Sequence, residues 1–316
     1  MTARTATNRL TCHIKNYRPE DFESYVRFHE EIRMLGSIPS RTLPLTIALQ
    51  LHRPHYDPTQ DLFLAIADEK VIAYLDVSRE TEIGRLVLDC MVRPAERRKG
   101  IATALFDHAM QYAAETGIQV VHVNIARDNA TAKGLLQGLN FTFVRRFIEF
   151  GLNFADKPLP GIPETEFTCR HLQHGEEQVL AELQNLAFTN TWGFNPNTAE
   201  DIVYSLKLQA GNPSNIILAF KENQIIGYCW TVPQAGKGIS STGQRSLIHM
   251  LGVNPEYRRQ GTGNMLLSTG IRYLKGKGSD SVILTADSEN TDACNLYRSF
   301  GFKVVSTNLW YERRLI

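Results

Sequence analysis

The feature that most constrains this chain is an internal repeat. Residues of unrelated types recur at a nearly fixed distance of 157 to 161 positions: Thr11-Cys12 as Thr168-Cys169, Val92 and Pro94 as Val253 and Pro255, and Arg97, Gly100, Asn129 and Phe141 as Arg258, Gly261, Asn290 and Phe302. Self-similarity at one period indicates duplication. The 316 residues therefore contain one domain-sized unit twice, and we expect two like domains.

The seam between the two copies lies at 156–163, where three prolines and a glycine occur close together. Proline and glycine disfavour the interiors of helices and strands. We therefore expect an N-terminal domain over 9–155, a proline-rich linker over 156–163 and a C-terminal domain over 164–316.

Both halves show the same order of patterns. A helix comes first, followed by a strand hairpin, an apolar strand, a loop rich in Arg and Gly, an amphipathic helix, a further strand, a helix and closing strands. The clearest of these lie at 20–34, 61–78, 86–92 and 120–125 in the first half and at 176–188, 216–232, 247–253 and 282–286 in the second. Strands mixed with helices in this order predict an α/β or α+β sheet domain.

Charge and cysteine usage exclude several classes of protein. Lys and Arg number 34 and Asp and Glu 33, without a basic stripe, so no nucleic-acid partner is expected. No apolar run approaches the roughly 18–20 residues of a membrane helix, so no membrane partner is expected either. The five cysteines are widely spread, which is typical of reduced thiols in the cytoplasm.

Two loops carry the clearest chemistry, and each joins an apolar strand to a helix: Arg97-Arg98-Lys99-Gly100-Ile101-Ala102 and Arg258-Arg259-Gln260-Gly261-Thr262-Gly263. Glycine permits close backbone approach, and a helix N-terminus offers unpaired N–H groups. Successive amides bind anions, so we expect a phosphate or pyrophosphate there. The alternative is a tight turn with exposed arginines, but two copies with the same downstream Asn favour a binding site.

Neither loop fits two other phosphate signatures. A P-loop requires Gly-Lys-Ser/Thr after four residues, and both loops lack it. The dinucleotide fingerprint requires a third glycine, where the second loop has Leu266, and the first loop departs from it at Ala102 and Leu105.

The motifs resemble those of a known family. Arg-x-x-Gly-x-Gly/Ala, after a strand that ends Val-x-Pro, resembles motif A of the GCN5-related N-acetyltransferases (GNAT). The string Asn290-x-x-Ala293-x-x-x-Tyr297-x-x-x-Gly301-Phe302 is similar to the second signature of that family. The resemblance covers both halves, and the tandem layout is most similar to mycothiol synthase and its tandem relatives.

This resemblance implies two tandem GNAT-type domains, each with a mixed, mostly antiparallel, twisted sheet flanked by helices. It implies acetyl-CoA as co-substrate and no metal, with the loop amides on the pyrophosphate and Leu251–Val253 pairing with the pantetheine arm. The implied cofactor-binding residues are Leu251, Gly252, Val253, Arg258, Arg259, Gln260, Gly261, Thr262, Gly263, Asn264 and Asn290 in the second half and Val92, Arg97, Arg98, Lys99, Gly100, Ile101, Ala102, Thr103 and Asn129 in the first.

Tyr297 is the implied general acid, because family members place this tyrosine near the CoA sulfur. The first half has Leu136 at the equivalent position, which cannot donate a proton. The alternative for Tyr297 is an aromatic side chain that packs on the sheet. This difference favours catalysis in the second half and a first half that is non-catalytic or weakly active.

His249 is the candidate general base. An alkyl amine titrates near ~10, so it must lose a proton before attack, and imidazole suits that task. A similar His-x-x-x-Val strand occurs in a family member with a catalytic histidine, whereas Leu247 occupies the place of the glutamate of mycothiol synthase and Leu88 is the counterpart of His249. The alternative is a buried, hydrogen-bonded histidine.

Acceptor binding is assigned to Trp192 and Phe194, in the loop after the first helix of the second half, with simple packing as the alternative. Asp89 is a substrate-binding candidate in the first half, or a carboxylate paired with Arg85 or Arg93. Cys90 and Cys294 lack an obvious activating partner, so direct transfer is favoured over an acetyl-cysteine route.

The sequence thus predicts an acyl-CoA-dependent N-acetyltransferase that moves an acetyl group to a primary amine of a small molecule. The alternatives are a CoA-binding sensor or pseudoenzyme and a protein or peptide N-acetyltransferase. The oligomeric state stays open, and a monomer fits because two domains of one chain can pack on each other.

Overall fold

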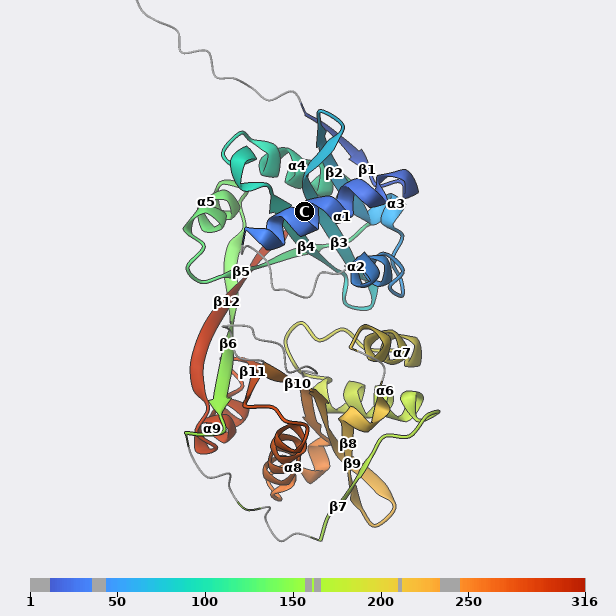
Figure 1. Ribbon diagram of the computed structural model, residues 1–316, viewed down its shortest axis with the longest axis vertical. Helices are drawn as coiled ribbons and strands as arrows, with labels where there is room; N and C mark the ends of the chain where they lie inside the picture. Colours follow the sequence, from blue (N-terminus) through green and yellow to red (C-terminus); the bar gives the residue numbers. More distant parts are fainter. Residues whose placement is uncertain are drawn as a thin grey trace, which may run out of the picture. The chain divides into compact units, whose positions relative to one another are not determined.

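The computed structural model describes residues 12–35, 44–156, 161, 166–209, 212–233 and 245–315. The chain forms two compact units (Figure 1). The first unit contains the residues up to Asn124, Thr131–Thr142 and the end of the chain from Tyr311. The second contains Ile125–Ala130 and Phe143–Trp310.

The first unit is a sheet of antiparallel strands with one parallel pair. Strands β1 to β4 pair antiparallel in chain order, and β4 pairs parallel with β5. Its elements are β1 (His13–Asn16), α1 (Phe22–Met34), α2 (Pro44–Leu51), α3 (Pro58–Asp61), β2 (Leu62–Ala67), β3 (Lys70–Glu80), β4 (Arg85–Val92), α4 (Ile101–Glu115), β5 (Val120–Ala126) and α5 (Ala130–Gly138).

The second unit repeats this order. Strands β7 to β10 pair antiparallel, and β10 pairs parallel with β11. Its elements are β7 (Thr168–His171), α6 (Glu177–Phe188), α7 (Ala199–Leu208), β8 (Ile216–Lys221), β9 (Gln224–Val232), β10 (Arg245–Val253), α8 (Thr262–Gly276), β11 (Ser281–Asp287) and α9 (Thr291–Ser299). The expected mixed, mostly antiparallel sheet flanked by helices is confirmed in both halves.

Apolar residues cover both faces of the second sheet. Along β8, Ile216 and Leu218 pack in a core with α6 and α7, whereas Ile217 and Ala219 pack in a core with α8 and α9. This alternation follows from the period of two in a strand. The strands of this sheet are therefore packed against helices on both faces. Polar residues that interrupt the apolar pattern of a strand are candidates for function.

The last strand of the first half of the sequence, and the end of the last strand of the second half, belong to the unit formed mainly by the other half. Strand β6 (Thr142–Asn153) pairs antiparallel with β11 of the second unit, from Asn153 opposite Ser281 to Phe147 opposite Asp287. The end of β12 (Lys303–Arg314) and the residue after it lie in the first unit, where Leu315 N donates to Gln119 O at 2.8 Å. The limits 9–155 and 164–316 thus describe the sequence repeat, whereas the boundary between the two compact units falls at the closing strands.

Two local expectations were wrong. The first element of each half is not a helix but a short strand, β1 or β7, which pairs with the first hairpin strand. Helices α2 and α7 were also not expected. A strand of four residues carries too little alternation to be recognised. Of the proline-rich linker 156–163, residues 157–160 and 162–163 lie outside the described residues. At its start, Lys303 Nζ donates to Asp156 Oδ2 at 3.0 Å.

Candidate active site

In both units the central parallel strands pair over part of their length only. Strand β10 continues to Val253, but its pairing with β11 covers Arg245–Leu247 opposite Ser281–Ile283. Strand β4 continues to Val92, but its pairing with β5 ends at Leu88 opposite Val123. Beyond these points each strand is still paired on its other side, by β9 or β3, but its N–H and C=O groups on the β11 or β5 side have no paired strand. An extended ligand can satisfy these groups as a strand would.

A β-bulge lies at His249 in the second unit. Ile248 is opposite Thr231 and Met250 is opposite Trp230, so His249 is an extra residue in β10. In the first unit β3 and β4 pair without such a shift, with Leu88 opposite Val77. Bulges redirect a side chain, so the two units differ at the position of the candidate base.

The His249 side chain is not the buried, hydrogen-bonded histidine of the alternative interpretation. It keeps an exposed surface and meets the buried Trp230 ring edge-on, with 5.1 Å between centroids. Among the described residues it has no hydrogen-bond partner. Because surrounding protein atoms displace part of its hydration, desolvation lowers the pKa of His249 to about 4. The imidazole is therefore neutral near pH 7, which is the protonation state a general base needs.

Tyr297 lies on α9 with 7% of its surface exposed. Its ring packs against Phe150 and Phe302, with centroid separations of 5.8 and 5.9 Å. Burial raises the pKa of Tyr297, and Cys229 and Cys294 raise it further. In the part of the chain that the structure describes, its hydroxyl has no hydrogen-bond partner. The hydroxyl thus keeps its proton at neutral pH, as a general acid must. Its counterpart Leu136 is buried.

The glycine-rich loops place left-handed glycines directly before the two long helices. Gly261 has φ 86° before α8, and Gly100 has φ 83° before α4. This conformation favours glycine. The first amides of each helix have no partner within the helix. The turn at the glycine leaves them available to an anion.

The leading arginines of both loops bind main-chain carbonyls. Arg258 Nε donates to Val253 O at 3.2 Å and its Nη2 to Ala187 O at 2.6 Å, while Arg97 Nε donates to Val92 O at 3.2 Å. These side chains hold the loop to the strand end. The phosphate-binding capacity therefore rests mainly on backbone amides.

The other loop side chains also have local partners. Arg259 pairs with Asp292 at 2.6 Å, and Lys99 pairs with Glu96 at 2.7 Å. Gln260 Nε2 donates to Glu256 O at 3.0 Å, and the buried Thr262 donates through Oγ1 to Tyr257 O at 3.0 Å. The remaining expected residues lie in or beside the first helical turns: Arg98, Ile101, Ala102 and Thr103 at α4 and Gly263 and Asn264 at α8.

Gly252 allows helix α6 to lie close to strand β10. A Cβ atom at this position would lie 2.5 Å from Cε1 of Tyr228 and 3.1 Å from both Ala187 Cβ and Phe188 Cε2. Only glycine fits without displacing these side chains. It thereby supports the conformation of Leu251–Val253, the segment expected beside the pantetheine arm.

Asn290 is a helix cap. Its Oδ1 accepts from Ala293 N at 3.1 Å, which fixes the start of α9 and thus the position of Tyr297 on that helix. Asn129 holds the corresponding place before α5, with its own N–H donating to Ala126 O at 3.0 Å. The buried Cys294 donates weakly to Asp287 O at 3.5 Å, and burial raises its pKa, which does not favour a reactive thiolate.

Both expected acceptor-binding aromatics lie in the second unit but in different clusters. Phe194 stacks on Phe188 at 5.3 Å between centroids. Trp192 meets Phe147 of β6 at 6.1 Å and Trp310 of β12 at 5.8 Å. No local pattern indicated Phe147 and Trp310, because they reach Trp192 through long-range strand pairing.

Asp89 is exposed on β4, and neither expected arginine binds it. Arg85 forms an ion pair with Glu80, and Arg93 forms one with Glu31 at 2.9 Å. Instead Tyr74 Oη donates to Asp89 Oδ2 at 2.8 Å.

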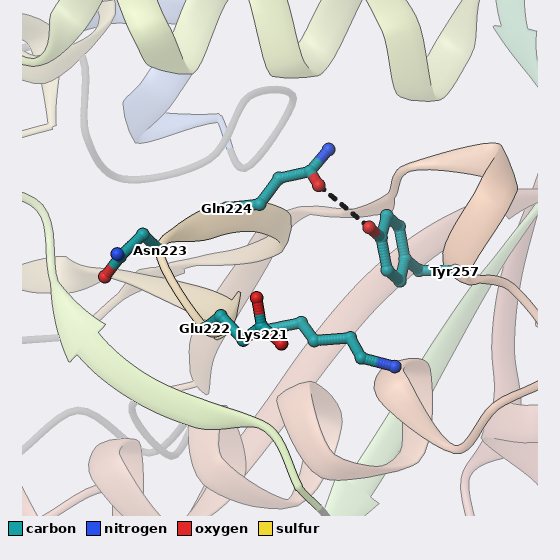
Figure 2. A pocket seen from close by; sticks show the side chains of 5 residues that line it. All are labelled: Lys221, Glu222, Asn223, Gln224 and Tyr257. Atoms are coloured by element: carbon teal, nitrogen blue, oxygen red, sulfur yellow. Dashed lines mark hydrogen bonds between the residues drawn. The ribbon is translucent and has the colours of Figure 1, made fainter.

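A depression of about 640 Å³ lies at the turn between β8 and β9 (Figure 2). It is lined by Lys221, Glu222, Asn223, Gln224 and Tyr257, and Tyr257 Oη donates to Gln224 Oε1 at 2.8 Å. It contains none of the expected site residues, and Lys221 is engaged with Glu166 at 2.6 Å.

The described ranges contain neither a cluster of metal-binding side chains nor a membrane-spanning helix. No group of three or more His, Cys, Asp or Glu side chains there is arranged to hold a metal ion. Within the same ranges, no helix has the length and apolar character needed to cross a membrane.

An α+β fold with an open strand edge beside a helix N-terminus suits an extended ligand that ends in phosphate. The profile of the acetyltransferase (GNAT) family matches residues 25–141 and 178–302. The chain belongs to the acetyltransferase (GNAT) family, and the family expected from the two motifs is confirmed. Membership makes it an N-acetyltransferase and implies use of acetyl-CoA.

Relatives cover most of the chain. A mycothiol acetyltransferase of Stackebrandtia nassauensis is 27% identical over 262 residues, which are 82% of this chain and 84% of that protein. Among solved structures, a GCN5-related N-acetyltransferase from Sphaerobacter thermophilus covers 98% of this chain and 97% of its own at a TM-score of 0.72 and 22% identity. A tandem GNAT protein from the clavulanic acid biosynthesis pathway covers 96% and 98% at a TM-score of 0.71 and 13% identity. The tandem arrangement is thus confirmed.

Proposed function

We propose that this chain transfers the acetyl group of acetyl-CoA directly to a primary amine of a small molecule, and that the second unit is the active one. The observation that carries the proposal is the presence in one unit of His249, as the extra residue of the β10 bulge, and of Tyr297 on α9. The first unit has Leu88 and Leu136 at these positions and lacks both functions. The names of the relatives support a small-molecule acceptor.

The residues of the second unit fit acetyl-CoA. The edge of β10 beyond Leu247 is free of β11, and Gly252 leaves no side chain in the way of α6. The left-handed Gly261 presents the first amides of α8 to an anion. When bound, acetyl-CoA supplies the acetyl group as a reactive thioester.

The chain's own groups then divide the proton transfers. The neutral imidazole of His249 takes the proton of the attacking amine, directly or through water, as the nitrogen–carbon bond forms. The backbone N–H groups near Val253 stabilise negative charge on the carbonyl oxygen. Tyr297 supplies a proton to the sulfur as the carbon–sulfur bond breaks, and water restores both groups. Asn290 acts as a positioning residue through the N-cap of α9.

The acceptor side of the second unit is aromatic. Trp192, Phe147 and Trp310 are partly exposed and lie together, and the Arg145 guanidinium lies 5.3 Å from the Trp192 ring. Arg145 also pairs with Asp287 at 3.5 Å and with Glu289, which anchors this cluster to the end of β11. Such walls suit an amine that carries an apolar or ring-shaped portion.

The test is a mass-spectrometric screen of primary amines and peptides with acetyl-CoA and the full chain. We expect N-acetylated small amines, with loss of product in His249→Ala and Tyr297→Phe. Exposed His174 and partly buried Tyr257 provide matched controls as His174→Ala and Tyr257→Phe, which should retain turnover. Acetyl-CoA binding without transfer to any amine would instead indicate a sensor, and transfer to peptides alone would indicate a protein N-acetyltransferase.

A further inference from the structure

One arginine joins the glycine-rich loop of the second unit to the end of helix α6. Arg258 Nη2 donates to Ala187 O at 2.6 Å, and its Nε donates to Val253 O at 3.2 Å. Helix α6 ends at Phe188, so the carbonyl of Ala187 is among the last four, which have no partner within the helix. The guanidinium therefore holds the C-terminus of α6 and the end of β10 together.

No carboxylate compensates the charge of Arg258. In the part of the chain that the structure describes, no Asp or Glu pairs with it, and no group binds its Nη1. The neighbouring Arg259, in contrast, pairs with Asp292 at 2.6 Å. Arg258 is exposed, so its charge and the N–H groups of Nη1 are available to an anion on the loop amides.

The first unit has the same loop arginine without the connection to a helix end. Arg97 Nε donates to Val92 O at 3.2 Å, as Arg258 does to the end of β10. Among the described residues, however, Arg97 makes no bond to α1, the helix that corresponds to α6. The connection is thus a property of the second unit.

A glycine explains this difference between the units. Gly252 lies opposite Tyr228 in the second unit, whereas Met91 lies opposite Tyr74 at the same place in the first. A Cβ atom at Gly252 would lie only 3.1 Å from Ala187 Cβ. The missing side chain therefore lets the end of α6 come close to β10 and within reach of the arginine, whereas Met91 carries a side chain that packs against the core beside α1.

The chain after α6, residues 189–197, is attached to the last turns of this helix, and we call it the aromatic loop. Thr191 N donates to Phe188 O at 2.8 Å, and Phe194 stacks on Phe188 with 5.3 Å between centroids. Farther along, Asn197 N donates to Asn185 Oδ1 at 2.8 Å, and Asn185 Nδ2 donates to Asn197 O at 2.9 Å. Whatever fixes the end of α6 therefore also fixes the aromatic loop.

The packing between α6 and the aromatic loop leaves two polar atoms without partners. Gln184 is fully buried, and its Nε2 has no hydrogen-bond partner in the described ranges, nor has the buried Oδ1 of Asn195. Buried polar groups are nearly always bonded, and an unmade bond raises the free energy of the arrangement that contains it. The aromatic loop can therefore gain hydrogen bonds when a ligand orders it.

We infer that Arg258 is a positioning residue that couples the acetyl-CoA site to the aromatic loop: its free N–H groups bind the diphosphate of the coenzyme, and the end of α6 is thereby held in place. A bond to a diphosphate oxygen is charge-assisted and fixes the guanidinium more firmly than the two carbonyls alone. Because coupling between two sites is reciprocal, a ligand that orders the aromatic loop also tightens coenzyme binding. The inference rests on the proposed function only in taking the second unit as the one that uses acetyl-CoA.

Hydrogen–deuterium exchange of the full chain, with and without saturating coenzyme A, tests this inference without an acceptor. We expect coenzyme A to slow the exchange of the amides of 189–195 by at least about fivefold in the wild type. Arg258→Lys keeps the charge but not the planar fork that serves two carbonyls and an anion, so it should bind coenzyme A and lose most of this protection. Arg259→Ala removes an equal charge from the same loop and, as the matched control, should keep the protection at saturation.

Exchange at 189–195 that coenzyme A leaves unchanged in the wild type would overturn the inference, and so would equal protection in Arg258→Lys. If Arg258→Lys fails to fold by thermal melting, Arg258→Gln replaces it, with the same loss of protection expected. Because the readout needs coenzyme A alone, protection that depends on Arg258 in a chain that acetylates no amine would support the inference and contradict the proposed function. Acetylation of small amines without such protection would do the reverse.

Discussion

The imidazole Nε2 of His122 on β5 lies 3.1 Å from Oε2 of Glu312 on β12. The two residues come from opposite halves of the sequence, yet both belong to the first unit. The contact is part of the attachment of the closing strand, together with the bond from Arg313 Nη1 to Leu139 O at 3.2 Å.

This pair predicts a loss of stability in mild acid. Burial and Arg85 lower the pKa of His122, although Glu312 opposes them. Because the unfolded histidine titrates near ~6.5, the unfolded chain binds more protons below that pH, and the free energy of unfolding falls as the pH falls through ~6.5. His122→Gln should lose less stability than the wild type between pH 7 and pH 5 in calorimetry. His174→Gln, at an exposed position, should behave as the wild type.

The pH dependence of transfer tests the state of His249. A base must be deprotonated, and the pKa of His249 is lowered to about 4. We expect kcat/KM, expressed per neutral amine, to stay nearly constant from pH 8 to about pH 5 and to fall only as the pH approaches 4. A fall centred near pH 6.5 that vanishes in His249→Ala would mean that the imidazole is hydrated as in free histidine.

Tyr297→Phe removes the hydroxyl that would donate the proton and keeps the aromatic ring that packs in the core. Phenylalanine keeps the contacts with Phe150 and Phe302, so the melting temperature should change little. Because general acid catalysis contributes about 10²–10⁴-fold, kcat should fall by at least about 10²-fold with the KM for acetyl-CoA within about twofold. Steady-state kinetics beside Tyr257→Phe measures this. An unchanged kcat would remove Tyr297 from the proposed mechanism.

Gly252→Ala should disturb the site through the backbone of β10. The added Cβ would lie 2.5 Å from the Tyr228 ring, so α6 or the ring must move. Overpacking of this kind costs about 1–3 kcal/mol, and acetyl-CoA should bind more weakly in a calorimetric titration. Gly276→Ala is the control, since nothing lies within 4 Å of its added Cβ, and it should be neutral or slightly stabilising. Equal effects in both variants would contradict this account.

Phe150→Leu tests whether the first half of the sequence supports catalysis in the second unit. Phe150 is fully buried and its ring contacts Tyr297. We expect a destabilisation of about 1–2 kcal/mol from the lost packing and a lower kcat from the less ordered tyrosine. Exposed Val304 serves as a control in Val304→Ala. Loss of stability with an unchanged kcat would assign Phe150 to packing alone.

Local signals in the sequence were sufficient for the loops and the central strands. A glycine before an amphipathic helix is readable in sequence, and Gly100 and Gly261 adopt the left-handed conformation expected of that position. The hairpins and the order of the elements after them were likewise predictable, because apolar runs bounded by turn residues can be recognised without knowing a distant partner strand. Family membership followed from the same segments.

Long-range pairing could not be predicted from these signals. Nothing near Phe147 or Trp310 indicates that they meet Trp192, and nothing near Asp89 indicates Tyr74 as its partner. The bulge at His249 depends on the register of β9 and β10, which periodicity does not reveal. Arg97 and Arg258 were expected to add charge toward a phosphate, but each finds a nearer carbonyl at its strand end.

The exchange of closing strands has a consequence for how this gene can change. After a duplication, one copy is ordinarily free to drift while the other keeps the activity. Here β6 of the first copy supplies Phe150 to the helix that carries Tyr297, and β12 of the second copy supplies Glu312 to the first unit. Deleting or transplanting either copy would therefore also remove closing-strand residues from the unit of its sister.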